Sequence, residues 1–143
     1  RFKVNTPFLL DHEVCNVRLT SVSKTEDGIE ILPNSDVFIF RMSYYNYIKL
    51  NMNYMISKFT ADTWHQVDII VNWNLQQDVL DDQEIKIYID NEFKEKTLFF
   101  NNQILKLGSD PVHNRIEYAN ALILYGLSPS GSSRFKDIEI CIK

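Results

Sequence analysis

The stretch Trp64–Phe93 constrains the fold more than any other part of the chain, because it predicts a β-hairpin with a long acidic loop. In its first half Val67, Ile69 and Val71 alternate with polar residues, and Ile70 is the exception. In its second half three isoleucines occupy every second position. A period of two puts the aliphatic side chains of each strand on one face, so both strands are expected to cover a common core.

Short strands separated by turns are predicted along the rest of the chain. They are residues 13–20, 29–32, 36–42, two strands within 44–56, then 93–100, 104–107, 116–125 and 135–143. Residues 2–10 are an apolar lead-in broken by a proline, 21–28 a polar turn, and Asn101-Asn102 a turn. A helical turn at 118–122 competes with the strand 116–125. Strand 36–42 is apolar on both faces, which is typical of a strand covered on both sides. This pattern predicts an all-β, two-sheet antiparallel sandwich or jelly roll.

Length and charge narrow the class of protein. A chain of 143 residues has the size of one domain, so we expect a single β-sandwich domain over residues 1–143. The formal net charge of −4, with scattered Lys and Arg, argues against nucleic acid as a partner. No apolar segment reaches the length of a membrane span. The chain starts with Arg1 and shows no signal peptide, so we expect a domain excised from a larger or processed protein.

The two cysteines, Cys15 and Cys141, are too few for a disulfide scaffold and lack zinc-ligand spacing. They are expected either to form one bridge, stabilising by about 4–5 kcal/mol through loop entropy, or to be two buried thiols. Cys15 is in phase with Val17, whereas Cys141 is in phase with Asp137 and Glu139. One cysteine would therefore face inward and the other outward, and a bridge would need a β-bulge.

The order of several short motifs resembles that of the concanavalin A-like lectin and laminin G-like superfamily. The motifs are Trp64-His65-Gln66-Val67, the segment 87–92, the segment 105–109 and the final run 135–140. The resemblance covers about residues 60–142. It implies a jelly roll whose first and last strands are neighbours, which would place Cys15 and Cys141 in adjacent strands. It also implies an extracellular adhesion or carbohydrate-binding module, in a family with many calcium-dependent members.

The loop 74–83 carries Asp78, Asp81 and Asp82. Clustered carboxylates on a loop suit calcium, although the spacing is not that of an EF-hand and charged loops are often simply solvated. Long loops in compact domains are frequently functional, so this loop is also a candidate contact surface.

A second candidate site lies in the run 44–56. Strand alternation puts Tyr45 and Tyr47 on one face with Lys49, and Asn51 and Asn53 flank them. Such rings and amides could contact a sugar or a peptide, while the alternative is ordinary tyrosine on a sheet surface.

Catalysis is not expected. The paired carboxylates of a glycosidase have no counterpart, since Glu84-Ile85-Lys86 breaks the pattern. The serines of the loop 126–134 lack the strand-turn-helix elbow of a serine hydrolase. Trp64 and His65 are expected to pack at the start of a core strand.

These observations predict a non-catalytic recognition module, secreted or on the cell surface, that binds a protein partner. Two alternatives stay open. One is a calcium-assisted, lectin-like module that binds a glycan, and the other is a structural domain inside a larger assembly.

Overall fold

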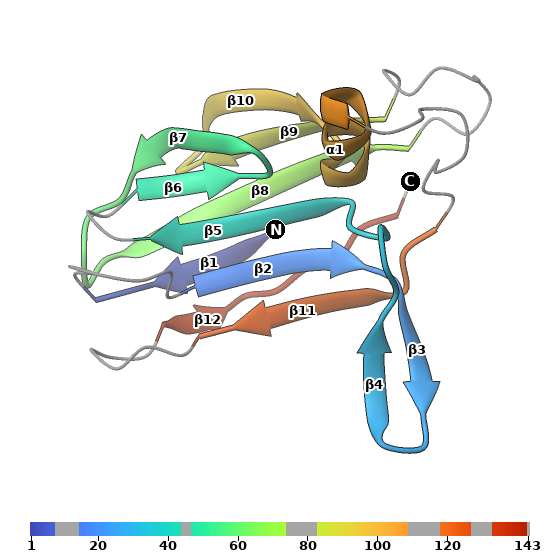
Figure 1. Ribbon diagram of the computed structural model, residues 1–143. Coiled ribbons are helices and arrows are strands. Elements are labelled where there is room, and N and C mark those ends of the chain that lie inside the picture. The colour runs from blue at the N-terminus through green and yellow to red at the C-terminus, as the bar shows by residue number, and fades with distance from the viewer. Residues whose placement is uncertain (8–14, 44–46, 74–82, 109–117, 127–132, 143) are drawn as a thin grey trace.

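Two five-stranded antiparallel sheets packed face to face form the body of the protein, as the computed structural model in Figure 1 shows. The structure describes residues 1–143 except 8–14, 44–46, 74–82, 109–117, 127–132 and 143, and omits the side chains at 53, 54, 105 and 106. The prediction of an all-β sandwich of two antiparallel sheets is confirmed. No helix in the described part of the chain is long and apolar enough to cross a membrane.

Sheet A contains the hairpin expected from the alternating sequence. Its strands, in spatial order, are β10 (Glu92–Leu98), β9 (Glu84–Ile89), β8 (Trp64–Asn72), β1 (Phe2–Asn5) and β12 (Arg134–Lys136). β8 and β9 pair antiparallel with Val67 opposite Ile89, so the predicted pairing of these strands is confirmed. Asp90 and Asn91 form the turn between β9 and β10, with φ of 53° and 67°.

Sheet B carries the other large group of strands. In spatial order they are β11 (Ala121–Tyr125), β2 (Cys15–Thr20), β5 (Phe38–Ser43), β6 (Tyr47–Leu50) and β7 (Asn53–Lys58). β5 is the central strand, and its burial on both faces was predicted from its sequence. Phe40 faces the core with no exposed area, and Ile39 on the opposite face is only 5% exposed.

The core lies between the two sheets and is built from alternate residues of each strand. Its fully buried side chains include Val4, Val17, Phe40, Met42, Ile48, Leu50, Val67, Ile85, Ile87 and Phe99. Phe2 of sheet A meets Phe40 of sheet B edge to face, with ring centroids 5.5 Å apart. The first strand, β1, therefore contributes directly to the packing of sheet A on sheet B.

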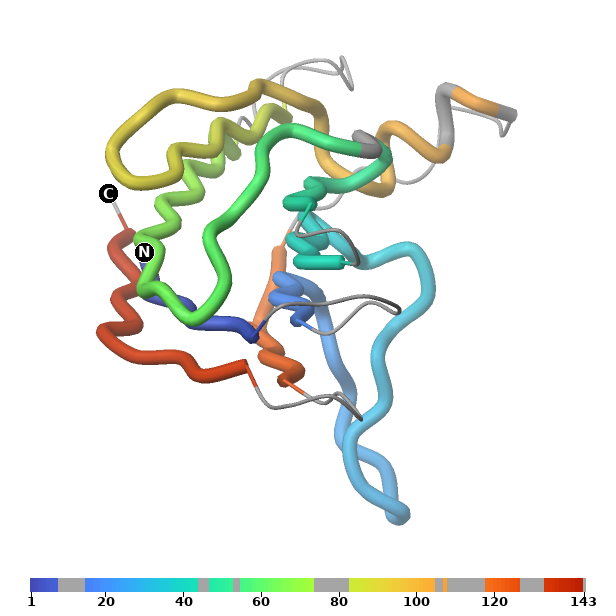
Figure 2. Tube along the Cα trace, turned by 90° about the vertical axis from the view of Figure 1, so that its left-hand side faces the viewer, coloured from blue at the N-terminus to red at the C-terminus, as the bar shows by residue number. Residues whose placement is uncertain are grey.

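A two-stranded ribbon, which we call the arm, projects from the sandwich (Figures 1 and 2). It consists of β3 (Val22–Thr25) and β4 (Gly28–Ile31), which pair only with each other in the described part of the chain. The prediction of a polar turn over 21–28 is wrong, because half of that segment is strand β3. Polar residues can occupy a strand whose faces are both close to water, so alternation does not mark it.

Residues 100–108 form the helix α1 (Phe100–Gly108), where a turn and a short strand were expected. Phe100, Ile104 and Leu107 follow helical spacing. The amide of Asn102, a residue interpreted as turn-forming, is buried and donates to Gln83 Oε1 at 3.1 Å. Packing of this segment against the end of sheet A overrides its turn propensity.

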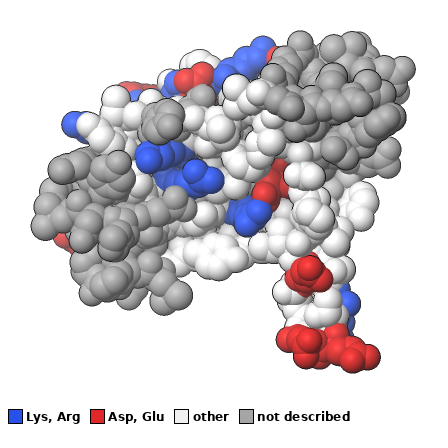
Figure 3. All heavy atoms as spheres, in the orientation of Figure 1, with Lys and Arg blue, Asp and Glu red and all other residues white. Residues whose placement is uncertain are grey.

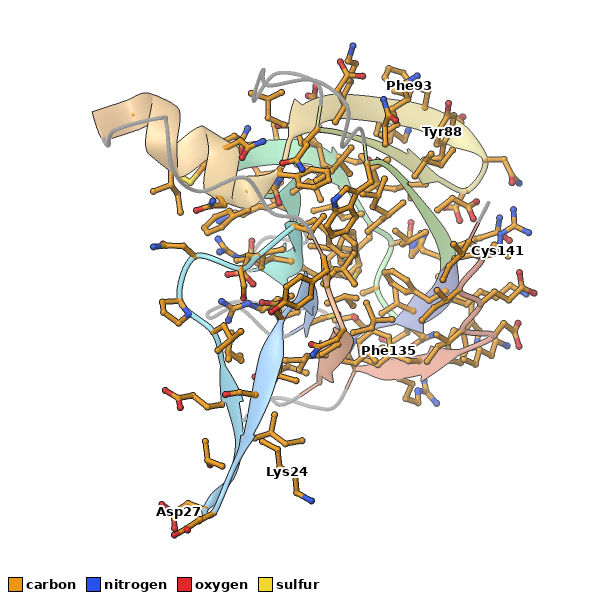
Figure 4. All side chains as sticks on the ribbon, turned by 90° about the vertical axis from the view of Figure 1, so that its right-hand side faces the viewer. Lys24, Asp27, Tyr88, Phe93, Phe135 and Cys141 are labelled. Carbon is orange, nitrogen blue, oxygen red and sulfur yellow. The ribbon has the colours of Figure 1, made fainter. Side chains whose placement is uncertain are left out.

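The first and last strands, β1 and β12, are neighbours in sheet A. However, β12 ends at Lys136 instead of continuing through 143, and Asp137 has a φ of 51°. The left-handed residue breaks the ladder, although Arg1 and Glu139 still exchange main-chain hydrogen bonds of 3.0 and 2.9 Å. Cys141 lies in this exposed terminal segment (Figure 4).

Neither expectation for the cysteines holds in full, because the two thiols are not bridged and only one of them is buried. Cys15 is completely buried in β2 of sheet B, while Cys141 is exposed beside sheet A. The expectation of adjacent strands fails because the strand next to β12 is β1, and β2 instead pairs with β5 and β11.

Candidate functional site

The residues predicted from the tyrosine-rich run do not form one exposed site. Asn51 is 2% exposed, and its side-chain amide lies inside the fold. Its Oδ1 accepts a hydrogen bond from the Ile39 amide at 2.9 Å, and its Nδ2 donates to the Leu98 carbonyl at 2.8 Å. Asn51 therefore holds the β6–β7 turn to its neighbours, and its assignment to a partner-binding surface is wrong.

Tyr47 lies half-buried on the outer face of sheet B, with Lys58 Nζ 5.0 Å from its ring centre. Tyr45, the Asn53 side chain and the predicted calcium ligands Asp78, Asp81 and Asp82 lie outside the described residues. Within the described residues, no group of three His, Cys, Asp or Glu side chains is placed to hold a metal ion.

His65 connects two loops at one end of sheet A. Its Nδ1 lies 2.7 Å from Asp90 Oδ2, and its Nε2 lies 3.0 Å from both the amide and the carbonyl of Thr60. The imidazole is only 8% exposed. Because both ring nitrogens already have partners within the fold, this geometry supports the expected scaffold role of His65.

Trp64, in contrast, does not pack into the core. β8 turns His65 inward, so strand alternation turns Trp64 outward, and the indole is 38% exposed. Two cations from β12 lie over the ring: Lys136 Nζ at 4.1 Å and Arg134 Cζ at 6.0 Å from its centre. Trp64 does stand at the start of β8, as expected, but its indole packs against these cations on the outer face and not in the core.

Further apolar side chains are exposed on the same outer face of sheet A. Tyr88 and Phe93 are direct partners across β9 and β10, and their rings meet edge to face with centroids 5.5 Å apart. Figure 4 shows both rings on the side of sheet A that faces away from sheet B. Phe93 is 56% exposed, and Ile70 on β8 is 54% exposed. We call Trp64, Ile70, Tyr88 and Phe93, with Arg134 and Lys136, the outer face of sheet A.

Ion pairs surround these apolar groups. Arg1 Nε lies 2.6 Å from Asp68 Oδ1, and Lys3 Nζ lies 2.8 Å from Asp137 Oδ2. Burial alone would raise the pKa of Asp68, but hydrogen bonds from Arg1 and Gln66 outweigh it and lower that pKa. The hydrogen bond from Lys3 likewise lowers the pKa of Asp137. Both carboxylates therefore remain charged at neutral pH beside the exposed rings.

The outer face of sheet A is shallow. A hollow lined by Ile70, Val71, Asn72, Glu84 and Lys86 lies on it and is open to solvent. Small molecules are usually bound in deep, enclosed apolar clefts, whereas protein partners bind broad surfaces with aromatic and arginine side chains at their centre. The geometry of this face fits a macromolecule better than a small ligand.

Sequence reasoning missed this face, although the signal was present. The alternation that turns Val67 and Ile87 inward also turns Trp64, Ile70 and Tyr88 outward. Comparison with protein-family models, with curated proteins and with solved structures finds no match to this chain.

Proposed function

We propose that this domain is a non-catalytic recognition module that binds a protein partner through the outer face of sheet A. One observation carries the proposal: Trp64 stands exposed on a regular sheet, with Lys136 and Arg134 over its ring. Trp, Tyr and Arg are the side chains that contribute most to protein–protein binding energy.

The preordered geometry of these rings supports a binding role. Trp64 lies on β8 and its two cations on β12, with β1 between the strands, so the ring spans a neighbouring strand. Tyr88 and Phe93 fix each other by their edge-to-face contact. Side chains ordered before binding lose less conformational entropy on association, which favours affinity.

The charges indicate the kind of partner surface. Arg134 and Lys136 place positive charge over the indole, so the partner should offer an apolar pocket for Trp64 with carboxylates at its rim. Carboxylates at the rim of this pocket would also replace part of the hydration of Arg134 and Lys136.

We also propose that the sandwich is a jelly roll of the concanavalin A-like and laminin G-like type and that it acts outside the cell. The neighbouring first and last strands, β1 and β12, support this topology. The order of the Trp64-His65 strand and the β9–β10 turn supports the same relationship. The extracellular location rests on that resemblance alone.

Site-specific photo-crosslinking tests the proposed function. A photoreactive amino acid would replace Ile70 on the outer face of sheet A, and a matched variant would replace Tyr125, which is 44% exposed on the outer face of sheet B. We expect one protein adduct from position 70 in cell-surface extracts and none of that adduct from position 125. The adduct's purified protein should then bind the unmodified domain.

Two results would contradict the proposed function. In one, crosslinking at position 125 yields the same adduct as strongly as position 70. In the other, a glycan array shows a sugar that competes with the captured protein, which would favour a lectin-like module instead.

A further inference from the structure

The arm has one apolar face and one polar face. Val22 pairs with Ile31 and Lys24 with Ile29, so these side chains share one face, while Ser23 and Glu30 pair on the other. Ile29 is 76% exposed. A lone two-stranded ribbon is at best marginally stable in water, and this one pairs with no further strand in the described part of the chain.

The root of the arm is firmly hydrogen-bonded to the sandwich. Ser35 Oγ lies 2.8 Å from Thr20 Oγ1 and donates to the Leu32 carbonyl at 2.7 Å. Ser21 Oγ donates to the Tyr118 carbonyl at 3.0 Å. The arm is therefore held out in a defined direction, as Figures 1 and 2 show from two sides.

The outer edge of β3 has the geometry of an edge strand that accepts another strand. The side chain of Asn120 bonds both main-chain groups of Val22: the Val22 amide donates to Oδ1 at 2.8 Å, and Nδ2 donates to the Val22 carbonyl at 3.0 Å. One side-chain amide thus occupies the place where a paired strand would begin. In an antiparallel ladder the outward positions alternate, so the main-chain groups of Lys24 point to the same edge.

The hydrogen bonds inside the arm agree with this alternation. Leu32 donates to the Ser21 carbonyl at 2.9 Å, which makes that pair the hydrogen-bonded one next to Val22 and Ile31. Ser23 and Glu30 are the next such pair, and Lys24 lies between them and the turn. The Lys24 amide is therefore not needed to hold the arm together.

The tip of the arm is acidic. Glu26 and Asp27 form the turn between the two strands, and Figure 3 shows acidic residues gathered at the far end of the arm. With Glu30 the arm carries three acidic side chains against one cation, Lys24. A second copy of the arm would bring like charges together, so the charge pattern favours a different, basic partner.

We propose that the arm binds an extended segment of a partner protein along the outer edge of β3, as a third strand that begins beside Asn120. Main-chain hydrogen bonds to Lys24 supply the pairing, as in other cases of strand addition to an exposed sheet edge. The segment carries apolar side chains at alternate positions, and one of them packs beside Val22 on the apolar face of the arm. A Lys or Arg at the end of the segment meets Glu26 and Asp27 at the tip.

This inference is independent of the proposed function of sheet A. The arm and the outer face of sheet A share no residue, and Figure 4 shows Lys24 and Asp27 far from Tyr88 and Phe93. Variants on one surface therefore leave the other intact, and each proposal can fail separately.

The test uses a phage-displayed library of random linear peptides selected against the whole domain. We expect the enriched peptides to alternate apolar and polar residues and to end in Lys or Arg. Lys24→Pro should weaken their binding by at least about tenfold, because proline removes the outward amide donor. The matched variant Lys24→Thr keeps the main-chain donor and should bind within about threefold of the unchanged domain.

Reversing the tip charge with Glu26→Lys and Asp27→Lys should weaken binding of the basic peptides and permit peptides that end in Glu or Asp. Three results would overturn the inference. The selection enriches no peptide; the enriched peptides bind the Lys24→Pro variant as well as the unchanged domain; or sedimentation shows a dimer that Lys24→Pro dissociates, which would make a second copy the occupant.

Discussion

The ammonium group of Lys136 lies 4.1 Å from the centre of the Trp64 ring, although the two residues come from strands separated by β1. Such a cation–π contact contributes about 0.5–1 kcal/mol at an exposed site. Its main consequence is positional, because it holds an exposed indole in one orientation. The last strand of the chain thereby organises the surface presented by the predicted hairpin.

The buried amide of Asn51 predicts a large loss of stability on substitution. Asn51→Ala removes hydrogen bonds to Ile39 and Leu98 and places alanine at a φ of 53°. We expect a loss of about 2–4 kcal/mol in the free energy of unfolding, measured by urea denaturation.

Asn34 provides the matched control, because it has the same φ of 53° but is exposed. Asn34→Ala should cost only about 1 kcal/mol, the cost of the left-handed backbone. Equal losses at the two positions would refute the structural role of the Asn51 amide.

The contact between His65 and Asp90 predicts energetic coupling. His65→Phe and Asp90→Asn each disrupt the 2.7 Å interaction, and the double variant should be less destabilised than the sum of the two. A double-mutant cycle in urea should give a coupling energy on the order of 1 kcal/mol. Additivity within about 0.4 kcal/mol would show that the two side chains are not coupled.

The lowered pKa of Asp68 predicts a pH-dependent contribution to stability. Burial raises the pKa of Asp68, but hydrogen bonds from Arg1 and Gln66 outweigh that effect, so the net shift is downward. The Asp68 carboxylate is therefore protonated less readily in the folded protein than in the unfolded chain. The contribution is therefore present above the unfolded value of 3.8 and is lost as the pH falls through the folded pKa.

Asp68→Asn should accordingly lower the unfolding free energy at pH 7 by no more than about 1 kcal/mol, since the Arg1 partner is half-exposed. The difference from the unchanged domain should disappear in strong acid. Thermal unfolding between pH 2 and 7 checks this, with the exposed Asp62→Asn as the control. A difference that grows toward low pH would contradict the expected sign.

The separate positions of the two cysteines predict their reactivity toward a thiol reagent. Cys141 is exposed and should react in the folded protein, whereas Cys15 is fully buried and should react only after unfolding. Titration without reductant should therefore give one thiol in buffer and two in denaturant. If neither cysteine reacts with the thiol reagent in denaturant, the two cysteines form a bridge.

Much of the sandwich could be predicted from period-two alternation, which marks strands with one buried face. β8 and β9 were predicted for this reason, and β5 because both of its faces are apolar. The helix α1 was missed because Asn101-Asn102 was interpreted as a turn, while tertiary packing decides the structure there. Of the arm, β4 was predicted as the strand 29–32, whereas β3 was missed because its residues are polar and no other sheet covers them.

Alternation placed Cys15 correctly, because β2 is a regular strand with Cys15 and Val17 buried. It fails for Cys141, because β12 ends at Lys136 and the isoleucines around Cys141 are exposed as well. What the sequence could not supply was the strand order, because pairing of β1 with β12 depends on contacts between distant segments. The outer face of sheet A follows the same rule: Trp64 could be predicted to face outward, but its neighbours from β12 could not.

The most direct test of the account is the affinity of the captured partner for the Trp64→Ala domain, measured by calorimetry beside Tyr125→Ala. Removing a central exposed Trp should weaken binding by at least about 2 kcal/mol, roughly thirtyfold, while Tyr125→Ala on the opposite sheet should leave affinity unchanged. Both variants should keep the unfolding midpoint of the unchanged domain within a few degrees. Unchanged affinity of a folded Trp64→Ala domain would contradict binding through the outer face of sheet A.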